Sequence, residues 1–197
     1  MLVQSGLVNL SVVKEFYANF DHSRSSVFEF TTWVCGKRIV ITPDVWSTFL
    51  EIGRPQHPVY PLELLDDDIP NIHFNTVAEF LTGGPYEWPS GCLPHSLLSA
   101  NLRLLNLIVC YNIEPHGHHI DINHNRGYLL FAIANKLPVD LPVFMILQMY
   151  RTSGSARNVG MPFGLLLTKF LASKRVPDFA NDTYLEIHKR LNAQTIH

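Results

Sequence analysis

One stretch, residues 97–113, constrains the fold of this chain more than any other. Its large aliphatic residues recur at three- and four-residue spacing, which predicts a helix that is apolar on more than one face. Such a helix has to be enclosed by other elements. The longest apolar run inside it, Leu104–Ile113, contains Asn106 and Asn112 and is too short to cross a bilayer core of about 30 Å. The segment therefore predicts the central helix of a globular core, with Ser96 as its N-cap. Its expected buried face consists of Leu98, Leu102, Leu105 and Val109.

Further helices are expected on both sides of this central one. The expected ranges are 11–20, 43–52, 75–81, 128–137, 141–151, 161–173 and a more polar last helix, 181–192. Residues with short polar side chains stand where N-caps would be needed: Ser11, Thr42, Asn75, Asp121 or Asn123, and Asp140. Pro43 at a first turn, and Gly53 and Pro138 after helix ends, agree with these boundaries.

Strand-forming residues gather in one place only. Residues 27–34 and 38–41 are rich in β-branched and aromatic side chains and are joined through Gly36, which predicts a β-hairpin. The predicted fold is therefore mainly α, a single domain over residues 1–197 with about seven helices and one small N-terminal hairpin. Within it we expect three segments: helix, hairpin and helix over 1–53, an irregular proline-rich connector with a short helix over 54–94, and a helical core over 95–197.

The composition is that of a packed globule in a reducing compartment. Hydrophobic residues make up 47% of the chain and charged residues 16%, a balance unlike that of disordered chains. Three widely spaced cysteines, Cys35, Cys92 and Cys110, match neither a disulfide framework nor a paired zinc motif. We therefore expect reduced thiols, a location in the nucleus or cytoplasm, and no association with membranes.

Several phrases, taken in their order along the chain, resemble a known family. They are Val13-Lys-Glu-Phe-Tyr-Ala-Asn19, the Gly36-Lys-Arg-Ile-Val hairpin followed by a Thr-Pro-initiated helix, Leu129-Leu-Phe-Ala-Ile133 with Leu137-Pro-Val-Asp-Leu141, and Met161-Pro-Phe-Gly-Leu-Leu-Leu-Thr-Lys-Phe170. Over residues 7–177 the chain resembles the "putative plant transposon protein" family, akin to open-reading-frame-one products of Athila-type plant retrotransposons. The resemblance implies a plant source and descent from a retroelement. It implies no catalytic residues and no cofactor.

Catalytic motifs are not apparent in the sequence. The acid cluster Asp66–Asp68 lies in the proline-rich connector, where consecutive carboxylates diverge, so it does not resemble a two-metal transposase centre. No nucleophile elbow and no glycine-rich phosphate loop occurs, since Gly83-Gly84 is followed by proline. The leading hypothesis is therefore a non-enzymatic module whose helical half binds a protein partner or a second copy of itself.

Two alternatives remain open. The chain between Asp140 and Asp178 contains no acid, and its five cations could bind nucleic acid weakly: Arg151, Arg157, Lys169, Lys174 and Arg175. A histidine-rich connector could instead hold a metal ion for a metal-dependent enzyme, with His95 or Asp121 as an additional ligand; its members are His116, His118, His119 and His124. The N-terminal aromatic residues, from Phe16 to Trp33, are interpreted as core packing because few cations lie among them.

Overall fold

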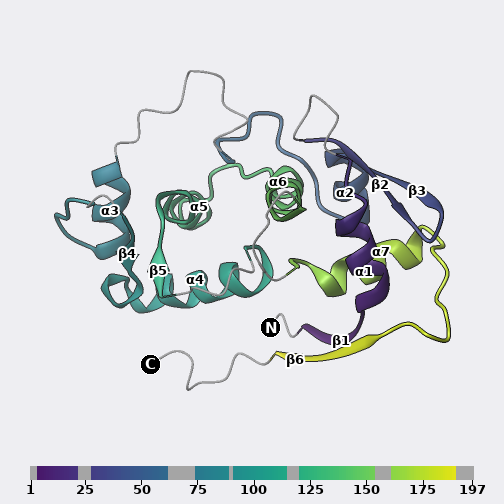
Figure 1. Ribbon diagram of the computed structural model, residues 1–197. Helices are drawn as coiled ribbons and strands as arrows, with labels where there is room; N and C mark the ends of the chain where they lie inside the picture. Colours follow the sequence, from purple (N-terminus) through teal and green to yellow (C-terminus); the bar gives the residue numbers. More distant parts are fainter. Residues whose placement is uncertain are drawn as a thin grey trace. The chain divides into compact units, whose positions relative to one another are not determined.

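A computed structural model describes residues 4–21, 28–61, 74–88, 91–114, 120–153 and 161–189 (Figure 1). The chain divides into two compact units. Among the described residues, the first unit contains those up to Ile52 and those from Met145 onward, and the second contains those from Gly53 to Phe144. The fold is mainly α, as predicted, with seven α-helices and three two-stranded sheets within the described ranges.

The predicted hairpin is present in the first unit. Strands β2 (Phe30–Val34) and β3 (Lys37–Ile41) pair antiparallel, and Val34 lies opposite Lys37. The turn therefore consists of Cys35 and Gly36, whose φ angles of 49° and 71° are both positive. Positive φ at both positions is typical of the type I′ turn, which matches the twist of the strands it connects.

Three helices of the first unit agree with the predicted ones in position but not always in their starts. Helix α2 (Pro43–Leu50) begins as predicted, because the Thr42 side chain accepts a hydrogen bond from the Val45 N–H. Helix α1 (Leu10–Ala18) is capped by Asn9, so the prediction of Ser11 as its cap was wrong. Helix α7 (Gly164–Ser173) begins three residues later than predicted, after Phe163 in the left-handed conformation.

The last predicted helix, 181–192, was wrong. Residues Tyr184–Lys189 form strand β6, which pairs antiparallel with strand β1 (Gln4–Asn9), and neither strand was predicted (Figure 1). Asn9 links the end of β1 to the start of β6, because its buried amide donates to Asp178, Asp182 and the Tyr184 hydroxyl while its oxygen caps α1. The strand thus forms through a partner about 180 residues away, and not through local preference.

Aromatic side chains fill the core of the first unit, as the sequence indicates. Phe20 stacks on Phe30 at 3.8 Å between ring centroids, and Phe16 meets both edge-on. Trp46 and Phe170 are fully buried and in contact at 5.0 Å. Trp33 is the exception to the predicted packing, since half of its surface (51%) is exposed.

The second unit is built from helices and a short two-stranded sheet. Helices α3 (Phe74–Thr82), α4 (Ala100–Asn112) and α5 (His124–Ala134) pack with the pair β4 (Leu93–Pro94) and β5 (Asp121–Ile122). A 3₁₀ turn, η2 (His95–Leu97), lies between β4 and α4. Helix α6 (Leu141–Ser153) begins in this unit and continues into the first.

Two predicted caps of these helices are confirmed. Asn123 accepts from the Arg126 N–H at the start of α5, and Asp140 accepts from the Val143 N–H at the start of α6. Asp140 is buried and also accepts from Arg54, its guanidinium 2.9 Å away. The prediction of Asn75 as the N-cap of α3 was wrong, because Asn75 is already the second residue of that helix.

The central helix starts later than predicted. Ser96 lies in η2, and α4 begins at Ala100 after Ser99, so Leu98 precedes the helix. Leu98, Leu102 and Val109 are buried as expected, whereas Leu105 is only partly buried. Leu107 and Cys110 are buried in addition, so the face that packs is wider than the predicted one.

Three helices end in the same way and without glycine. After α2, α5 and α7 a left-handed residue is followed by the two reverse hydrogen bonds of the Schellman motif, for example Arg175 N–H to Ala172 O and Val176 N–H to Leu171 O. The left-handed residues are Glu51, Lys136 and Arg175, with φ of 56°, 56° and 59°. A side chain makes this conformation unfavourable, and glycine is the usual residue there.

Replacing Lys136 with glycine is therefore expected to stabilise the chain by about 0.5–1 kcal/mol, because it relieves the left-handed backbone. Thermal or chemical unfolding measures the change. Ala134→Gly, two residues earlier in the helical part of α5, is the matched control and should destabilise by up to about 1 kcal/mol. If both variants lose stability, the backbone at Lys136 is not left-handed.

Candidate functional site

The histidine-rich connector lies mostly outside the described residues, which include His124 but not His116, His118 or His119. His124 is the first residue of α5, and its ring lies between those of Phe74 and Trp88 at 4.3 and 4.8 Å between centroids. His95 is tied to Ile120 through its backbone N–H. Within the described ranges, no three His, Cys, Asp or Glu side chains gather as metal ligands would.

The cysteines are free thiols, and two of them are held in their neutral form. Burial raises the pKa of Cys110 to about 11, and its thiol donates to Asn106 at 3.5 Å. Burial also raises the pKa of Cys35. A hydrogen bond to Glu15 and the negative charges of Glu15, Asp182 and Asp178 raise this pKa further. A raised pKa keeps little thiolate at neutral pH, so both sulfurs are weak nucleophiles.

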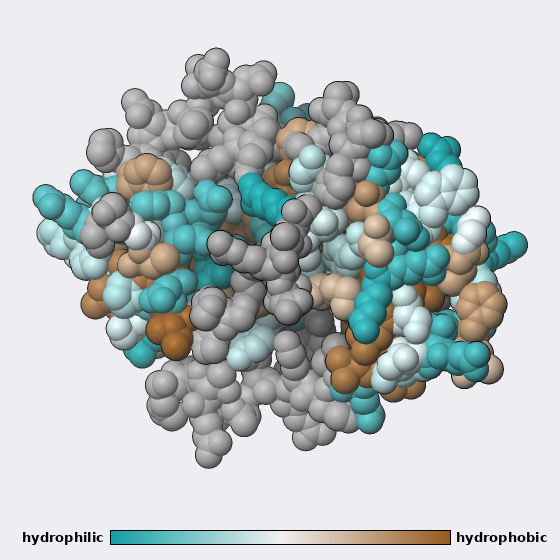
Figure 2. All heavy atoms as spheres, in the orientation of Figure 1, coloured by the Kyte–Doolittle hydropathy of each residue, from teal (hydrophilic) through white to brown (hydrophobic). Residues whose placement is uncertain are grey.

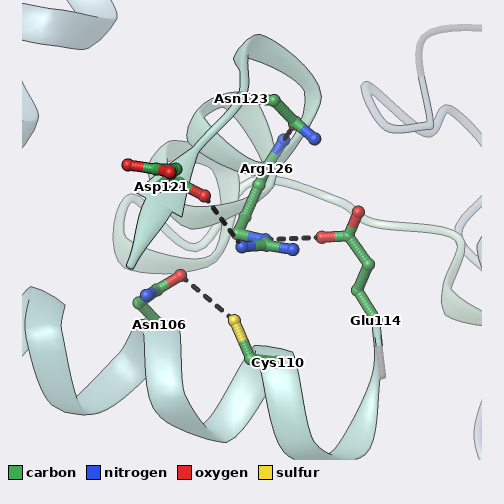
Figure 3. A network of polar contacts seen from close by, with 6 residues as sticks. All are labelled: Asn106, Cys110, Glu114, Asp121, Asn123 and Arg126. Atoms are coloured by element: carbon green, nitrogen blue, oxygen red, sulfur yellow. Dashed lines mark hydrogen bonds and ion pairs between the residues drawn. The ribbon is translucent and has the colours of Figure 1, made fainter. Parts of the chain in front are cut away.

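A buried ion pair connects α4 to α5 in the second unit (Figure 3). The Arg126 Nε donates to Glu114 at 2.7 Å, and its Nη1 donates to the Asp121 carbonyl at 3.2 Å. Both side chains are less than one-tenth exposed. With its charged groups paired and closed to solvent, this network holds the end of α4 against the start of α5 and β5; its role is structural.

The predicted cations are only partly brought together. Lys174 and Arg175 stand at the end of α7, Lys169 lies exposed in the same helix, and Arg151 lies near the end of α6, while Arg157 is outside the described residues. A residue that was not predicted, Lys37, joins the end of α7. Its ammonium donates to the carbonyls of Lys174 and Arg175 at 2.8 and 2.9 Å, so the hairpin tip lies against this helix terminus.

The exposed Trp33 lies at the same hairpin tip. It is directly opposite Arg38, which is also exposed, and the next pair along the hairpin is Val34 with Lys37. Sequence reasoning missed Trp33 and Arg38 because alternation alone did not indicate which face of the hairpin is covered. A signal was present in the sequence: a tryptophan followed, after a turn, by Lys-Arg.

A shallow cavity of about 450 Å³ lies between α2 and the end of α7. It is lined by Asp44, Val45, Thr48, Phe49, Ser173 and Lys174. The Lys174 ammonium lies 5.3 Å from the centroid of the Phe170 ring. The lining contains one carboxylate, Asp44, and one ammonium, Lys174, so its charges favour neither an anion nor a cation.

A second exposed feature is apolar and belongs to the β1–β6 ribbon, the strands β1 and β6 taken together. Leu7, Tyr184 and Leu185 are 57%, 43% and 49% exposed. Leu185 lies opposite Val8, so it shares a face with that residue, whereas Leu7 and Tyr184 lie on the other face. Figure 2 shows hydrophobic surface where Figure 1 draws this ribbon.

Within the described part of the chain, no helix combines the length and the apolar character needed to span a membrane.

Neither the curated proteins nor the solved structures contain a match to this chain. One protein family does match, over residues 1–177, under the description "Putative plant retrotransposon-related domain". The match covers both described units and ends shortly before β6. The chain therefore belongs to the plant retrotransposon-related family.

Proposed function

We propose that this domain is a non-enzymatic interaction module that associates with a second copy of itself through the outer edge of the β1–β6 ribbon. The observation that carries the proposal is the ribbon itself. It is a sheet of two strands with large apolar side chains exposed on both faces. A sheet of two strands also has an unpaired edge on each strand, and an exposed edge beside apolar side chains can pair with a further strand.

One edge of the ribbon is already covered. The Asn9 N–H points away from β6 and donates to the Thr168 hydroxyl of α7 at 3.1 Å. A Cβ on Gly164 of α7 would lie 3.2 Å from Val8, so helix and strand are in close contact. Among the described residues, the edge at which a new strand could pair is therefore that of β6.

The alternation of hydrogen-bonded and non-hydrogen-bonded pairs indicates which backbone N–H groups of β6 point away from β1. The Leu10 N–H donates to Thr183 O, so this is a hydrogen-bonded pair. From it, non-hydrogen-bonded and hydrogen-bonded pairs alternate along the ribbon. The N–H groups of Leu185 and Ile187 thus face β1, whereas that of His188 faces away from it. In the described part of the chain β6 pairs with β1 alone.

A second copy is the occupant that this edge favours. Two β6 edges that pair antiparallel are related by a two-fold axis, so each copy presents the same strand and the assembly closes at two. The formal net charge of −2 gives little repulsion between copies. The module thus needs no other protein to cover its edge.

A proline at position 188 tests the proposal. Because the His188 N–H faces away from β1, His188→Pro should leave the ribbon intact and abolish edge pairing. Sedimentation velocity over a concentration series should show a monomer–dimer equilibrium for the unmodified chain and a monomer for His188→Pro. At concentrations where both are monomeric, the two should have equal melting temperatures. His188→Ala, the reference for the lost side chain, should still dimerise.

Ile187→Pro is the matched control, because it removes an N–H that faces β1 and should lower the melting temperature. A chain that stays monomeric at every concentration, or a His188→Pro variant that dimerises like the unmodified one, would contradict the proposal.

A further inference from the structure

We infer that the edge of β1 that faces β6 is a strand-acceptor site, which β6 fills within its own chain and which β6 of a second copy can fill by exchange. We call this edge, from Gln4 to Leu10, the acceptor edge. It is the inner edge of the β1–β6 ribbon, whereas the self-association proposed above uses the outer edge of β6. Exchange at the acceptor edge and pairing at the outer edge can therefore be tested separately.

Helix α7 holds β1 in the first unit independently of β6. Val8 is buried and lies close to this helix, since a Cβ on Gly164 would be 3.2 Å from its side chain. On the side that faces away from β6, the Asn9 N–H donates to the Thr168 hydroxyl. The acceptor edge therefore stays in place when β6 departs, with its backbone groups ready to pair.

Strand β6, by contrast, is weakly attached. In the described part of the chain it pairs with β1 alone (Figure 1). Tyr184, Leu185 and Glu186 are all exposed. A segment with few buried side chains opens at a small fraction of the free energy of global unfolding. Strand β6 can thus separate while the rest of the first unit remains folded.

A buried amide at the end of the acceptor edge selects the occupant. Asn9 is 0% exposed, and its side-chain nitrogen donates to Asp178 and Asp182 at 3.1 and 2.8 Å and to the Tyr184 hydroxyl at 3.2 Å. An occupant without such acceptors would leave the amide buried and unpaired, which is unfavourable. The β6 strand of a second copy is preceded by the same two aspartates, so it satisfies Asn9 in full, whereas a strand of unrelated sequence does not.

The boundary of the family match separates the acceptor edge from its occupant. The match over residues 1–177 includes β1, α1 and α7, whereas Asp178, Asp182 and β6 lie beyond it. The part of the chain that the match covers therefore contains the acceptor edge without the strand that fills it. The occupant is separable from the domain that it completes.

Exchange requires a change in the connection between α7 and β6. Residues 177–183 are exposed except for the half-buried Asp182. They contain one turn, in which the Asp182 N–H donates to Phe179 O and the Phe179 N–H donates to the Asp182 carboxylate, each at 3.0 Å. Opening this turn lets β6 extend toward another chain without disturbing a buried apolar side chain.

The balance between the closed and exchanged forms depends on concentration. The contacts between β1 and β6 are the same in both, so the effective concentration of β6 near its own β1 decides between them. For a short linker this concentration is on the order of 1 mM, so about one-tenth of the chains should be exchanged at about 100 µM. At about 10 µM the exchanged fraction is on the order of one-hundredth, too small to obscure the sedimentation test of the outer edge.

Disulfide trapping between two different chains tests the exchange. Leu7 lies opposite Glu186 in a non-hydrogen-bonded pair, whose Cα atoms are about 4.5 Å apart, within the range of a disulfide. One full-length chain carries Leu7→Cys and the other Glu186→Cys, both with the exposed Cys92 replaced by serine. The two are mixed at about 100 µM, oxidised and analysed by mass spectrometry. The covalent heterodimer should be several-fold more abundant than with Phe80→Cys, an exposed position of the second unit, in place of Leu7→Cys.

The two proline variants separate exchange from outer-edge pairing. His188→Pro keeps the N–H groups that face β1, so the heterodimer should persist when both chains carry it. Ile187→Pro in the Glu186→Cys chain removes one of those N–H groups and should reduce the yield. A heterodimer that disappears with His188→Pro, or that is no more abundant than the Phe80→Cys control, would overturn the exchange.

A shorter connection should turn the exchange into a stable dimer. Deletion of residues 179–181 removes the turn and hinders β6 from reaching its own β1. In a His188→Pro background, this deletion variant should sediment as a dimer at about 10 µM, where His188→Pro alone is almost entirely monomeric. Insertion of Gly-Ser-Gly after Phe179 is the matched control and should leave the chain monomeric. A deletion variant that stays monomeric would show that a second copy does not fill the acceptor edge.

Discussion

Replacing Gly127 with alanine is expected to destabilise the chain by about 2–3 kcal/mol, near the upper end of the usual cost of overpacking. Gly127 is the fourth residue of α5, where alanine would by itself favour the helix by about 1 kcal/mol. A Cβ at this position would, however, lie 2.2 Å from Cη2 of Trp88. The indole is buried, so the helix and the ring have to separate. Differential scanning calorimetry should show a melting temperature lower by roughly 5–10 °C.

Gly84→Ala is the matched control, because a Cβ there meets no atom within 4 Å. The coupling can be isolated in a Trp88→Leu background, where Gly127→Ala should cost much less than it does in the unmodified chain. Equal, small effects of Gly127→Ala and Gly84→Ala would show that Trp88 does not lie on this helix.

Arg126→Met is expected to cost about 3–5 kcal/mol, because it leaves the buried Glu114 carboxylate without its partner. The backbone contribution should be small, since the Arg126 N–H can still donate to the Asn123 cap. Urea unfolding followed by circular dichroism measures the loss.

Replacing both members of the pair tests the reason for that loss. Arg126→Met combined with Glu114→Leu removes the stranded charge, so the double variant should be clearly more stable than Arg126→Met alone. Arg54→Met serves as a comparison, because its partner Asp140 keeps its capping bond and Arg54 is about one-third exposed. A double variant as unstable as the single one would mean that packing, and not the buried charge, dominates.

The starts of α2, α5 and α6 could be predicted from local sequence, whereas those of α1, α3 and α4 could not. Thr42, Asn123 and Asp140 each satisfy a backbone N–H through a side chain three residues earlier, a local interaction that the sequence displays directly. Helix ends were less predictable, because Glu51, Lys136 and Arg175 occupy positions where glycine would have been the signal.

The β1–β6 ribbon could not be predicted from local preference. Tyr184–Lys189 contains leucine, glutamate and lysine, which are good helix formers, and it becomes a strand because β1 offers it a partner. The contact between the β2–β3 hairpin and the end of α7 was missed for a related reason. Lys174 and Arg175 were recognised as candidates from the charge pattern, but their carbonyls lie against the hairpin tip through Lys37, which is about 140 residues earlier in the chain.

The order in which the ribosome produces the chain has a consequence for its folding. The second unit is an almost uninterrupted stretch, residues 53–144, and can fold as soon as it has emerged. The first unit cannot, because β1 is synthesised at the start and β6 some 180 residues later. At about 5–20 residues per second, β1 waits roughly 10–40 s for β6, although α1 meets β2 soon after its own synthesis. During that interval the apolar side chains of β1, such as Val8, are available to chaperones, so β1 is a part of the nascent chain that needs protection.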